Sequence, residues 1–272
     1  MMFLNEWTGF NLVPWQWVAV CFYGAFVGLS KTGIAGITTV MIPVMAIIFD
    51  ARESTGIVLP MLCFADLLAT FYYRRSADLK CILRLLPWAV SGFALALLVD
   101  HLVPARGFRF LIGISILCGV IIMLWNEFQA NKTKKKDINK EIDDSVPRKD
   151  IPFFRILKQA FFGVAGGFST MIGNAAGPIM TVYLLSMRLP KMSFVGTKAL
   201  FYLILNYIKL PLQIFAWNNI TFSGLRLGAL MIPFILIGAA LGIFLVKKIP
   251  ELFYRYFVLT MTIVTTFLLF IR

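Results

Sequence analysis

The sequence is poor in charged residues and in metal-ligating side chains. Charged residues make up 14% of the 272 positions, whereas a soluble domain carries about 25%. The single histidine, His101, and the four cysteines, which have no CxxC spacing, form no metal-binding pattern. Walker A, HExxH and GxSxG motifs are also absent. We therefore expect no catalytic residue, no metal site and no cofactor.

Hydrophobic residues dominate instead, at 60% of the chain, with a mean hydropathy of +0.84. Several apolar runs reach the length of about 20 residues that crosses a bilayer. These runs are continuous, whereas the strands of a β-barrel would alternate apolar and polar residues. The net charge of +13 does not indicate nucleic-acid binding, because most lysines and arginines lie in short loops between the runs. The sequence predicts an all-α polytopic membrane protein with about eight to ten transmembrane segments.

Eight hydrophobic blocks follow one another along the chain. They cover about residues 11–49, 54–73, 81–99, 108–125, 153–187, 192–216, 222–246 and 251–271. The first and fifth blocks are too long for one span, and each contains a glycine-rich break near its middle, which predicts a helical hairpin or a broken helix. The segment Asn126–Asp150 is charged and almost free of apolar residues. We expect a transmembrane repeat over 1–125, a cytoplasmic linker over 126–152 and a second repeat over 153–272.

The two halves resemble each other in sequence. Residues of the first half match those of the second in these pairs: Gly24 and Gly163, Gly28 and Gly167, Ser30 and Ser169, Gly56 and Gly196, Asp66 and Asn206. If the two long blocks each return to the side from which they entered, the basic turns and the linker all fall on the cytoplasmic side. Each half then crosses the membrane an odd number of times, which predicts inverted repeats with both chain termini extracytoplasmic.

The two glycine-rich breaks are the predicted binding site. Unwound backbone is tolerated in a bilayer only where it is buried in protein or lines a cavity. The helix that follows a break presents free N–H groups and a positive dipole end, which favour an anion. The side chains near the breaks that we expect to bind it are Ser30, Lys31, Thr32, Ser169, Thr170 and Asn174. In the alternative interpretation, the glycines serve helix packing alone and the hydroxyl groups bond backbone carbonyls.

Three ionisable residues lie inside other apolar blocks, where each suggests a function. Asp66 is near the middle of the second block, and it either carries a coupling proton or forms an ion pair with Lys209 that joins the two halves. Lys198 and Lys209 lie about three helical turns apart and therefore share a helix face. Both lysines are candidate anion ligands, although Lys198 could instead extend to the cytoplasmic headgroups.

The chain resembles the TauE/SafE family of sulfite and organosulfonate exporters. The resemblance rests on GAFVGLSKTGIAGITTVMIPVM, ARESTGIVLPMLCFADLLATFYYRR and FVGTKALFYLILNYIKLPLQIF. It implies a multi-pass carrier of the bacterial inner membrane with inverted repeats. The family's glycine-rich openings correspond to Gly28, Gly33, Gly36, Gly167 and Gly177, and its G-T-[SK] pattern to Gly196, Thr197 and Lys198.

The residue pattern and the resemblance both indicate a negatively charged substrate. Helix N-termini, hydroxyls and lysines favour an anion, and a cation carrier would place more carboxylates in its spans. We therefore expect an exporter of small sulfur-containing anions such as sulfite, sulfonates or sulfoacetate, working by alternating access. A proton is the candidate coupling ion and a homo-oligomer the candidate assembly. The alternative function is a membrane scaffold or assembly partner without transport, for which the linker would be essential and the breaks dispensable.

Overall fold

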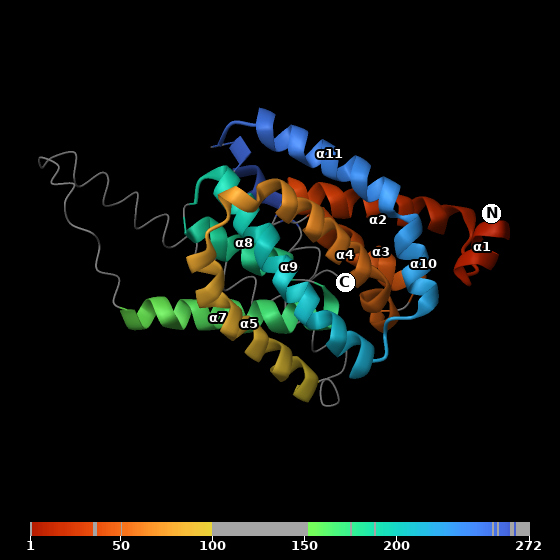
Figure 1. Cartoon of the computed structure of the whole chain (residues 1–272), viewed down its shortest axis with the longest axis horizontal. Helices are drawn as coiled ribbons and strands as arrows, with labels where there is room; N and C mark the ends of the chain where they lie inside the picture. The colour runs from red at the N-terminus through yellow and green to blue at the C-terminus, as the bar shows by residue number, and fades with distance from the viewer. Residues whose placement is uncertain are drawn as a thin grey trace, which may run out of the picture.

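The computed structural model describes residues 2–34, 37–49, 51–99, 152–174, 176–187, 189–251, 253–254, 256–261 and 264. The described residues form helices and no β-strand (Figure 1). The helices are α1 (Met2–Thr8), α2 (Pro14–Thr32), α3 (Ile37–Phe49), α4 (Ala51–Tyr73), η1 (Arg74–Ser76), α5 (Leu79–Val99), α7 (Pro152–Gly173), α8 (Ala176–Ser186), α9 (Lys191–Phe215), α10 (Phe222–Leu230) and α11 (Ile232–Lys248). The predicted block at 108–125 and the linker up to residue 151 lie outside the described residues.

Two of these helices are long and apolar enough to cross a membrane, at Glu53–Ser76 and Leu79–Val99. Helices α10 and α11 provide a third candidate if the pair, which is bent by 49°, counts as one span. The all-helical class is thus confirmed for the described residues, as is the presence of apolar helices that could span a membrane. The total of eight to ten segments stays a prediction.

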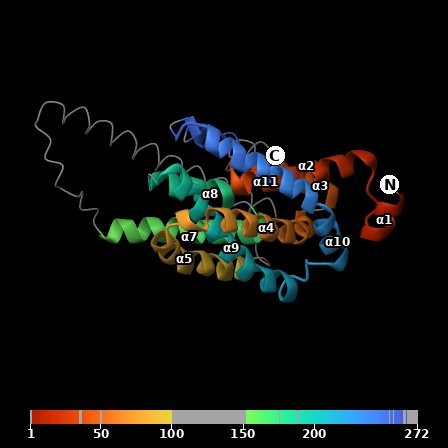
Figure 2. The same ribbon diagram turned by 45° about the horizontal axis from the view of Figure 1, so that its top comes forward.

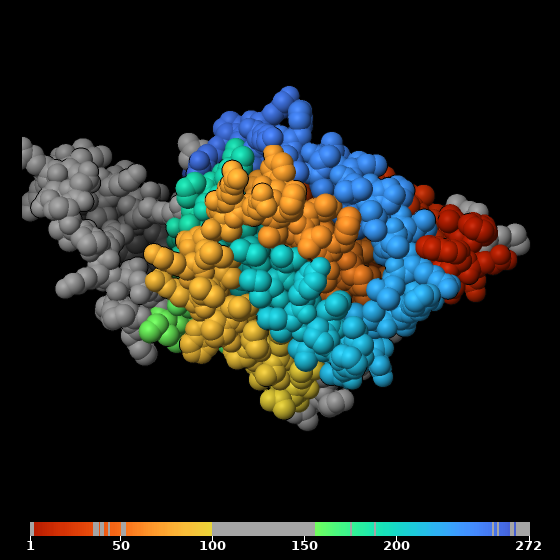
Figure 3. Space-filling view, viewed as in Figure 1, coloured from red at the N-terminus to blue at the C-terminus, as the bar shows by residue number. Residues whose placement is uncertain are grey.

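The molecule exposes many large apolar side chains on its outer faces and buries four charged ones. Phe71, Leu83, Leu98 and Phe215 are each at least 67% exposed on the outer faces of their helices. In the space-filling view, α9 lies between α5 on one side and α4 on the other (Figure 3). An apolar outer surface of this kind suits contact with lipid tails, since burial in a bilayer removes it from water.

Helices of the two halves pack together in exchanged pairs, each of which contains one helix from each half. Helix α2 of the first half packs along α11 of the second, and α7 of the second packs along α5 of the first (Figures 1 and 2). Helices α4 and α9 contact each other between these two pairs. The arrangement brings the ends of α2 and α7 toward the central pair.

Glycines allow the exchanged pairs to approach closely. A methyl group at Gly28 of α2 would overlap the carbonyl oxygen of Ile235 on α11. In the same way, a methyl group at Gly167 of α7 would overlap the carbonyl oxygen of Ala89 on α5. The packing interpretation therefore applies to Gly28 and Gly167, which lie inside their helices and before the breaks.

Turns that carry basic residues gather at one end of the molecule. The Ser193 hydroxyl donates to the Ser76 carbonyl at 2.8 Å, and the Lys191 ammonium donates to the Ile249 carbonyl at 2.7 Å. The Asp78 amide donates to the Thr197 hydroxyl at 2.8 Å. The turn after α4, the start of α9 and the end of α11 are therefore neighbours.

Candidate functional site

Both long hydrophobic blocks are interrupted close to a common pocket. Helix α2 ends at Thr32 and α3 begins at Ile37, whereas α7 ends at Gly173 and α8 begins at Ala176. The second interruption contains Asn174, whose φ of 53° lies in the left-handed region that asparagine tolerates better than most residues. The first turns of α3 and α8 contribute Thr38 and Gly177 to the pocket wall.

The pocket lies among α2, α3, α4, α7, α8 and α9 and has an empty volume of about 540 Å³, including the part open to solvent. Its wall combines charged and polar side chains with a smaller number of apolar and aromatic ones. The lining residues are Tyr23, Ser30, Lys31, Thr38, Ile42, Leu62, Thr170, Asn174, Gly177, Thr181, Lys198, Tyr202 and Asn206.

Four buried charged side chains surround this pocket, and they are all those that the described residues contain. Three are the lysines Lys31, Lys198 and Lys209, and the fourth is Asp66. When all four are ionised, the positive charges exceed the negative charge by two. Charges in a low-dielectric interior need compensation, so this excess favours an anion in the pocket.

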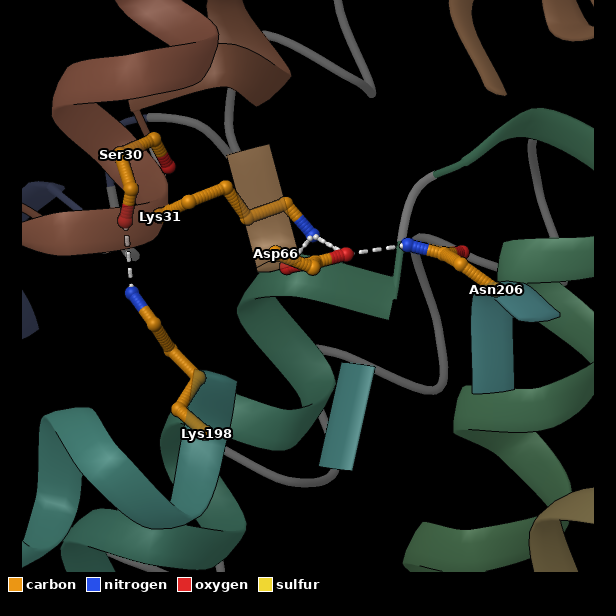
Figure 4. Close-up of polar contacts among 5 residues, drawn as sticks. All are labelled: Ser30, Lys31, Asp66, Lys198 and Asn206. Carbon is orange, nitrogen blue, oxygen red and sulfur yellow. Dashed lines mark hydrogen bonds and ion pairs between the residues drawn. The ribbon is translucent and has the colours of Figure 1, made fainter. Parts of the chain in front are cut away.

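Asp66 pairs with Lys31 across the junction of α2 and α4 (Figure 4). The Lys31 ammonium lies 2.8 Å from Asp66 Oδ1 and 2.9 Å from Oδ2. The Asn206 side-chain amide donates to Oδ2 at 2.6 Å, and the Tyr202 ring lies 4.2 Å from the Lys31 ammonium. Lys31 therefore reaches the pocket while Asp66, which is fully buried, is held behind it.

The predicted ion pair between Asp66 and Lys209 is wrong. Lys209 instead donates to the Thr170 carbonyl at the end of α7 and, at 2.6 Å, to Asn174 Oδ1. The reason is position along the helix, because Asn206 and Lys209 lie close to one turn apart and only Asn206 is level with Asp66. The donation also places a cation at a helix C-terminus, where the dipole favours it.

Lys198 does not extend to a headgroup region. Its side chain is 4% exposed, and its ammonium donates to the Ser30 carbonyl at 2.7 Å (Figure 4). Lys198 thus donates to a carbonyl at the end of α2, as Lys209 donates to a carbonyl at the end of α7. Unlike Lys209, Lys198 also lines the pocket.

Six of the residues expected at the site line the pocket together: Ser30, Lys31, Thr170, Asn174, Gly177 and Lys198. Thr32 and Gly33 lie elsewhere, since the Thr32 hydroxyl donates to the Ala239 carbonyl at 2.9 Å and Gly33 packs against Gly242 of α11. Ser169 is 1% exposed and is not part of this wall. Gly36 lies outside the described residues.

Sequence reasoning missed a polar stripe on α9. Lys198, Tyr202 and Asn206 recur every four residues, so they share the helix face that lines the pocket. Asn206 was noticed only as the counterpart of Asp66, and Tyr202 was not considered. A lysine, a tyrosine and an asparagine at four-residue intervals in an apolar block were the sequence signal that could have predicted this stripe.

The pocket has the chemistry of a binding site. Within the part of the chain that the structure describes, no group of three His, Cys, Asp or Glu residues could hold a metal ion. The groups present are ammonium ions, hydroxyls, amides and the first turns of two helices. Groups of these kinds can bind and orient an anion.

Comparison with known families assigns the chain. The model of the sulfite exporter TauE/SafE family matches residues 20–269. The chain belongs to the TauE/SafE family. No curated protein and no solved structure matches it. As a family member, the chain is a multi-pass membrane transporter with a small anion as its substrate, and the family is one of transporters and not of enzymes.

Proposed function

We propose that this protein exports small sulfur oxyanions, namely sulfite, sulfonates or sulfoacetate, and holds them in the pocket between the two helix interruptions. The observation that carries the proposal is the set of buried charges around the pocket. Lys31, Lys198 and Lys209 are opposed by the single carboxylate of Asp66, which Lys31 already neutralises. An oxyanion supplies the missing negative charge and accepts hydrogen bonds from ammonium and hydroxyl groups.

Lys198 is the direct anion ligand in this proposal. The Lys31 ammonium is occupied by both oxygens of Asp66, and the Lys209 ammonium by Thr170 and Asn174. Among the described residues, the Lys198 ammonium donates to one acceptor, the Ser30 carbonyl, although an ammonium carries three donors. It therefore has donors to offer to a ligand in the pocket.

Transport would proceed by alternating access between inverted repeats, covering about residues 1–125 and 153–272. The exchange of partners, α2 with α11 and α7 with α5, supports this, because a pseudo-twofold axis would relate these two pairs. The pocket next to the central helices α4 and α9 is where such an axis would place a substrate.

The membrane orientation follows from the basic turns. The turn after α4, the start of α9 and the end of α11 are neighbours and carry Arg74, Arg75, Lys191, Lys247 and Lys248. We assign this end, and the 126–152 linker with it, to the cytoplasmic side of the bacterial inner membrane, with both termini outside. A reporter active only outside the cytoplasm and inserted in the linker would contradict the assignment by being active.

The proposal is tested by flux in proteoliposomes. Wild-type protein is expected to move labelled sulfite or sulfoacetate, and Lys198→Gln should lower the affinity for the anion about tenfold or more, since a charge-assisted hydrogen bond contributes about 1.5–3 kcal/mol. Lys80→Gln is the matched control, because Lys80 is exposed. If a broad panel of anions produces neither flux nor thermal stabilisation of the wild type, the proposal fails.

A further inference from the structure

Three side chains in the pocket wall carry polar atoms that no described protein group binds. They are the Thr181 hydroxyl on α8 and, on α9, the Tyr202 hydroxyl and the Oδ1 atom of Asn206. Thr181 is 0% exposed, Asn206 1% and Tyr202 6%. Buried polar atoms are almost always hydrogen-bonded, so three unbonded ones in a single wall point to a ligand.

The three atoms differ in what they can recognise. The hydroxyls of Thr181 and Tyr202 can donate to an oxygen of an anion. Asn206 is different, because its Nδ2 is used by Asp66 at 2.6 Å and an ionised carboxylate can only accept. The atom of Asn206 without a partner is Oδ1, a carbonyl oxygen, which accepts a hydrogen bond and repels an oxyanion.

We infer that the pocket selects an oxyanion that also carries a hydrogen-bond donor, with Thr181 and Tyr202 binding the oxyanion and Asn206 Oδ1 accepting from the donor. The inference rests on the proposed anion transport and makes Asn206 a specificity-determining residue. The pocket wall contains further groups that can contact such a molecule. Lys198 is on the same α9 stripe for the anionic end, and Ile42 and Leu62 can contact a short alkyl part.

Two sulfonates, 2-hydroxyethanesulfonate and propane-1-sulfonate, test whether the ligand's hydrogen-bond donor contributes to binding. They have the same charge and nearly the same shape, and a hydroxyl in the first replaces a methyl group in the second. A hydroxyl that enters a pocket without an acceptor loses its bonds to water and is disfavoured. A preference for 2-hydroxyethanesulfonate therefore requires a protein acceptor.

The experiment measures the dissociation constants of both probes with the purified full-length protein. Wild type is expected to bind 2-hydroxyethanesulfonate about fivefold to tenfold more tightly, the ratio that one net neutral hydrogen bond produces. Asn206→Leu should bring the ratio to about one. Thr181→Val and Tyr202→Phe should weaken both probes by a similar factor and leave the ratio in place. The ratio separates recognition from a structural effect, because a disturbed Lys31–Asp66 pair would weaken both probes alike.

Matched controls come from the same chain. Thr70→Val removes another buried hydroxyl that no described group binds, and Tyr183→Phe removes a buried tyrosine hydroxyl, in both cases outside the pocket wall. Neither should change the affinity for either probe. If wild type binds the two probes equally, or if Asn206→Leu keeps the preference, the inference is overturned while anion binding stands. If wild type binds no anion of the panel, the proposed function fails as well.

Discussion

At the end of α2 the carbonyl groups are bound by Lys198, Tyr73 and Tyr254, whereas at the end of α7 they are bound by Lys209 and Gln213. A helix C-terminus leaves its last carbonyl oxygens without partners in the helix, and a buried carbonyl without a partner is costly. Both interruptions therefore need donors from neighbouring helices. The first draws on two tyrosines and the second on an amide.

Two of these donors correspond between the halves of the chain. Tyr73 and Gln213 are separated in sequence by the same interval as Gly56 and Gly196. Their acceptors, the carbonyls of Thr32 and Met171, are separated by the same interval as Ser30 and Ser169, at 2.9 Å and 3.4 Å from the donors. The two halves thus keep a contact in space while they change the side chain that makes it.

The two interruptions differ more in their charged residues than in these two neutral donors. Helix α2 carries its own cation, Lys31, which is paired with Asp66. Thr170 is at the corresponding position of α7, and the cation there is Lys209 from α9. A charge pair at the first interruption and a cation bound to neutral groups at the second should respond differently to mutation.

The largest effect is expected from Lys31→Met. The change leaves the fully buried Asp66 carboxylate without its cation, and removal of one partner of a buried pair costs about 3–5 kcal/mol. The unfolding temperature of the detergent-solubilised protein should fall sharply. Lys31→Met with Asp66→Leu should recover much of the loss, because neither member of the Lys31–Asp66 pair is then left buried without its partner. A double variant no more stable than Lys31→Met would show that the pair is not the cause.

The sequence was sufficient for the broad architecture because the relevant signals are local. The length and the glycines of 11–49 and 153–187 predicted a break in each block. Helices α2 and α7 end inside these blocks, and the part of the glycines in these ends stays a prediction. Six of the residues predicted for the site, five near the breaks and Lys198 in the sixth apolar block, meet in one pocket. Their part in binding stays a proposal.

The partner of Asp66 could not be predicted in the same way. The choice between Lys31 and Lys209 depends on how far α2 and α9 are shifted along α4, and the pattern of apolar residues does not carry this information. Tyr202 and Asn206 were missed for a related reason. An aromatic residue and an amide on an apolar helix resemble ordinary core residues until the opposite wall of the pocket is known.

A smaller effect is expected from Lys209→Met at the second interruption. The substitution leaves the Thr170 carbonyl and Asn174 Oδ1 without this donor. Each unsatisfied buried group costs about 1–3 kcal/mol, and we expect a total loss of about 2–3 kcal/mol because Asn174 is at a wall where water can reach it. Lys198→Met, which frees only the Ser30 carbonyl, should cost less stability and more anion affinity. Equal losses of stability in Lys209→Met and Lys198→Met would contradict the larger structural role assigned to Lys209.

The smallest effect is expected from the tyrosines at the first interruption. Tyr73→Phe and Tyr254→Phe each remove one hydroxyl that donates to a carbonyl, at 2.9 Å to Thr32 and 2.7 Å to Gly33, and each should cost about 1 kcal/mol in the free energy of unfolding. Tyr207→Phe is the matched control, since Tyr207 is 49% exposed, and it should change little.

The double variant of Tyr73 and Tyr254 decides whether the end of α2 is held as one unit. The two acceptors are adjacent residues, so loss of one bond would loosen the carbonyl that the other tyrosine binds. The second substitution should then cost less than it does alone, which a double-mutant cycle measures as a coupling energy. Strict additivity would instead mean that each tyrosine holds its carbonyl independently. The first interruption would then be held by separate contacts.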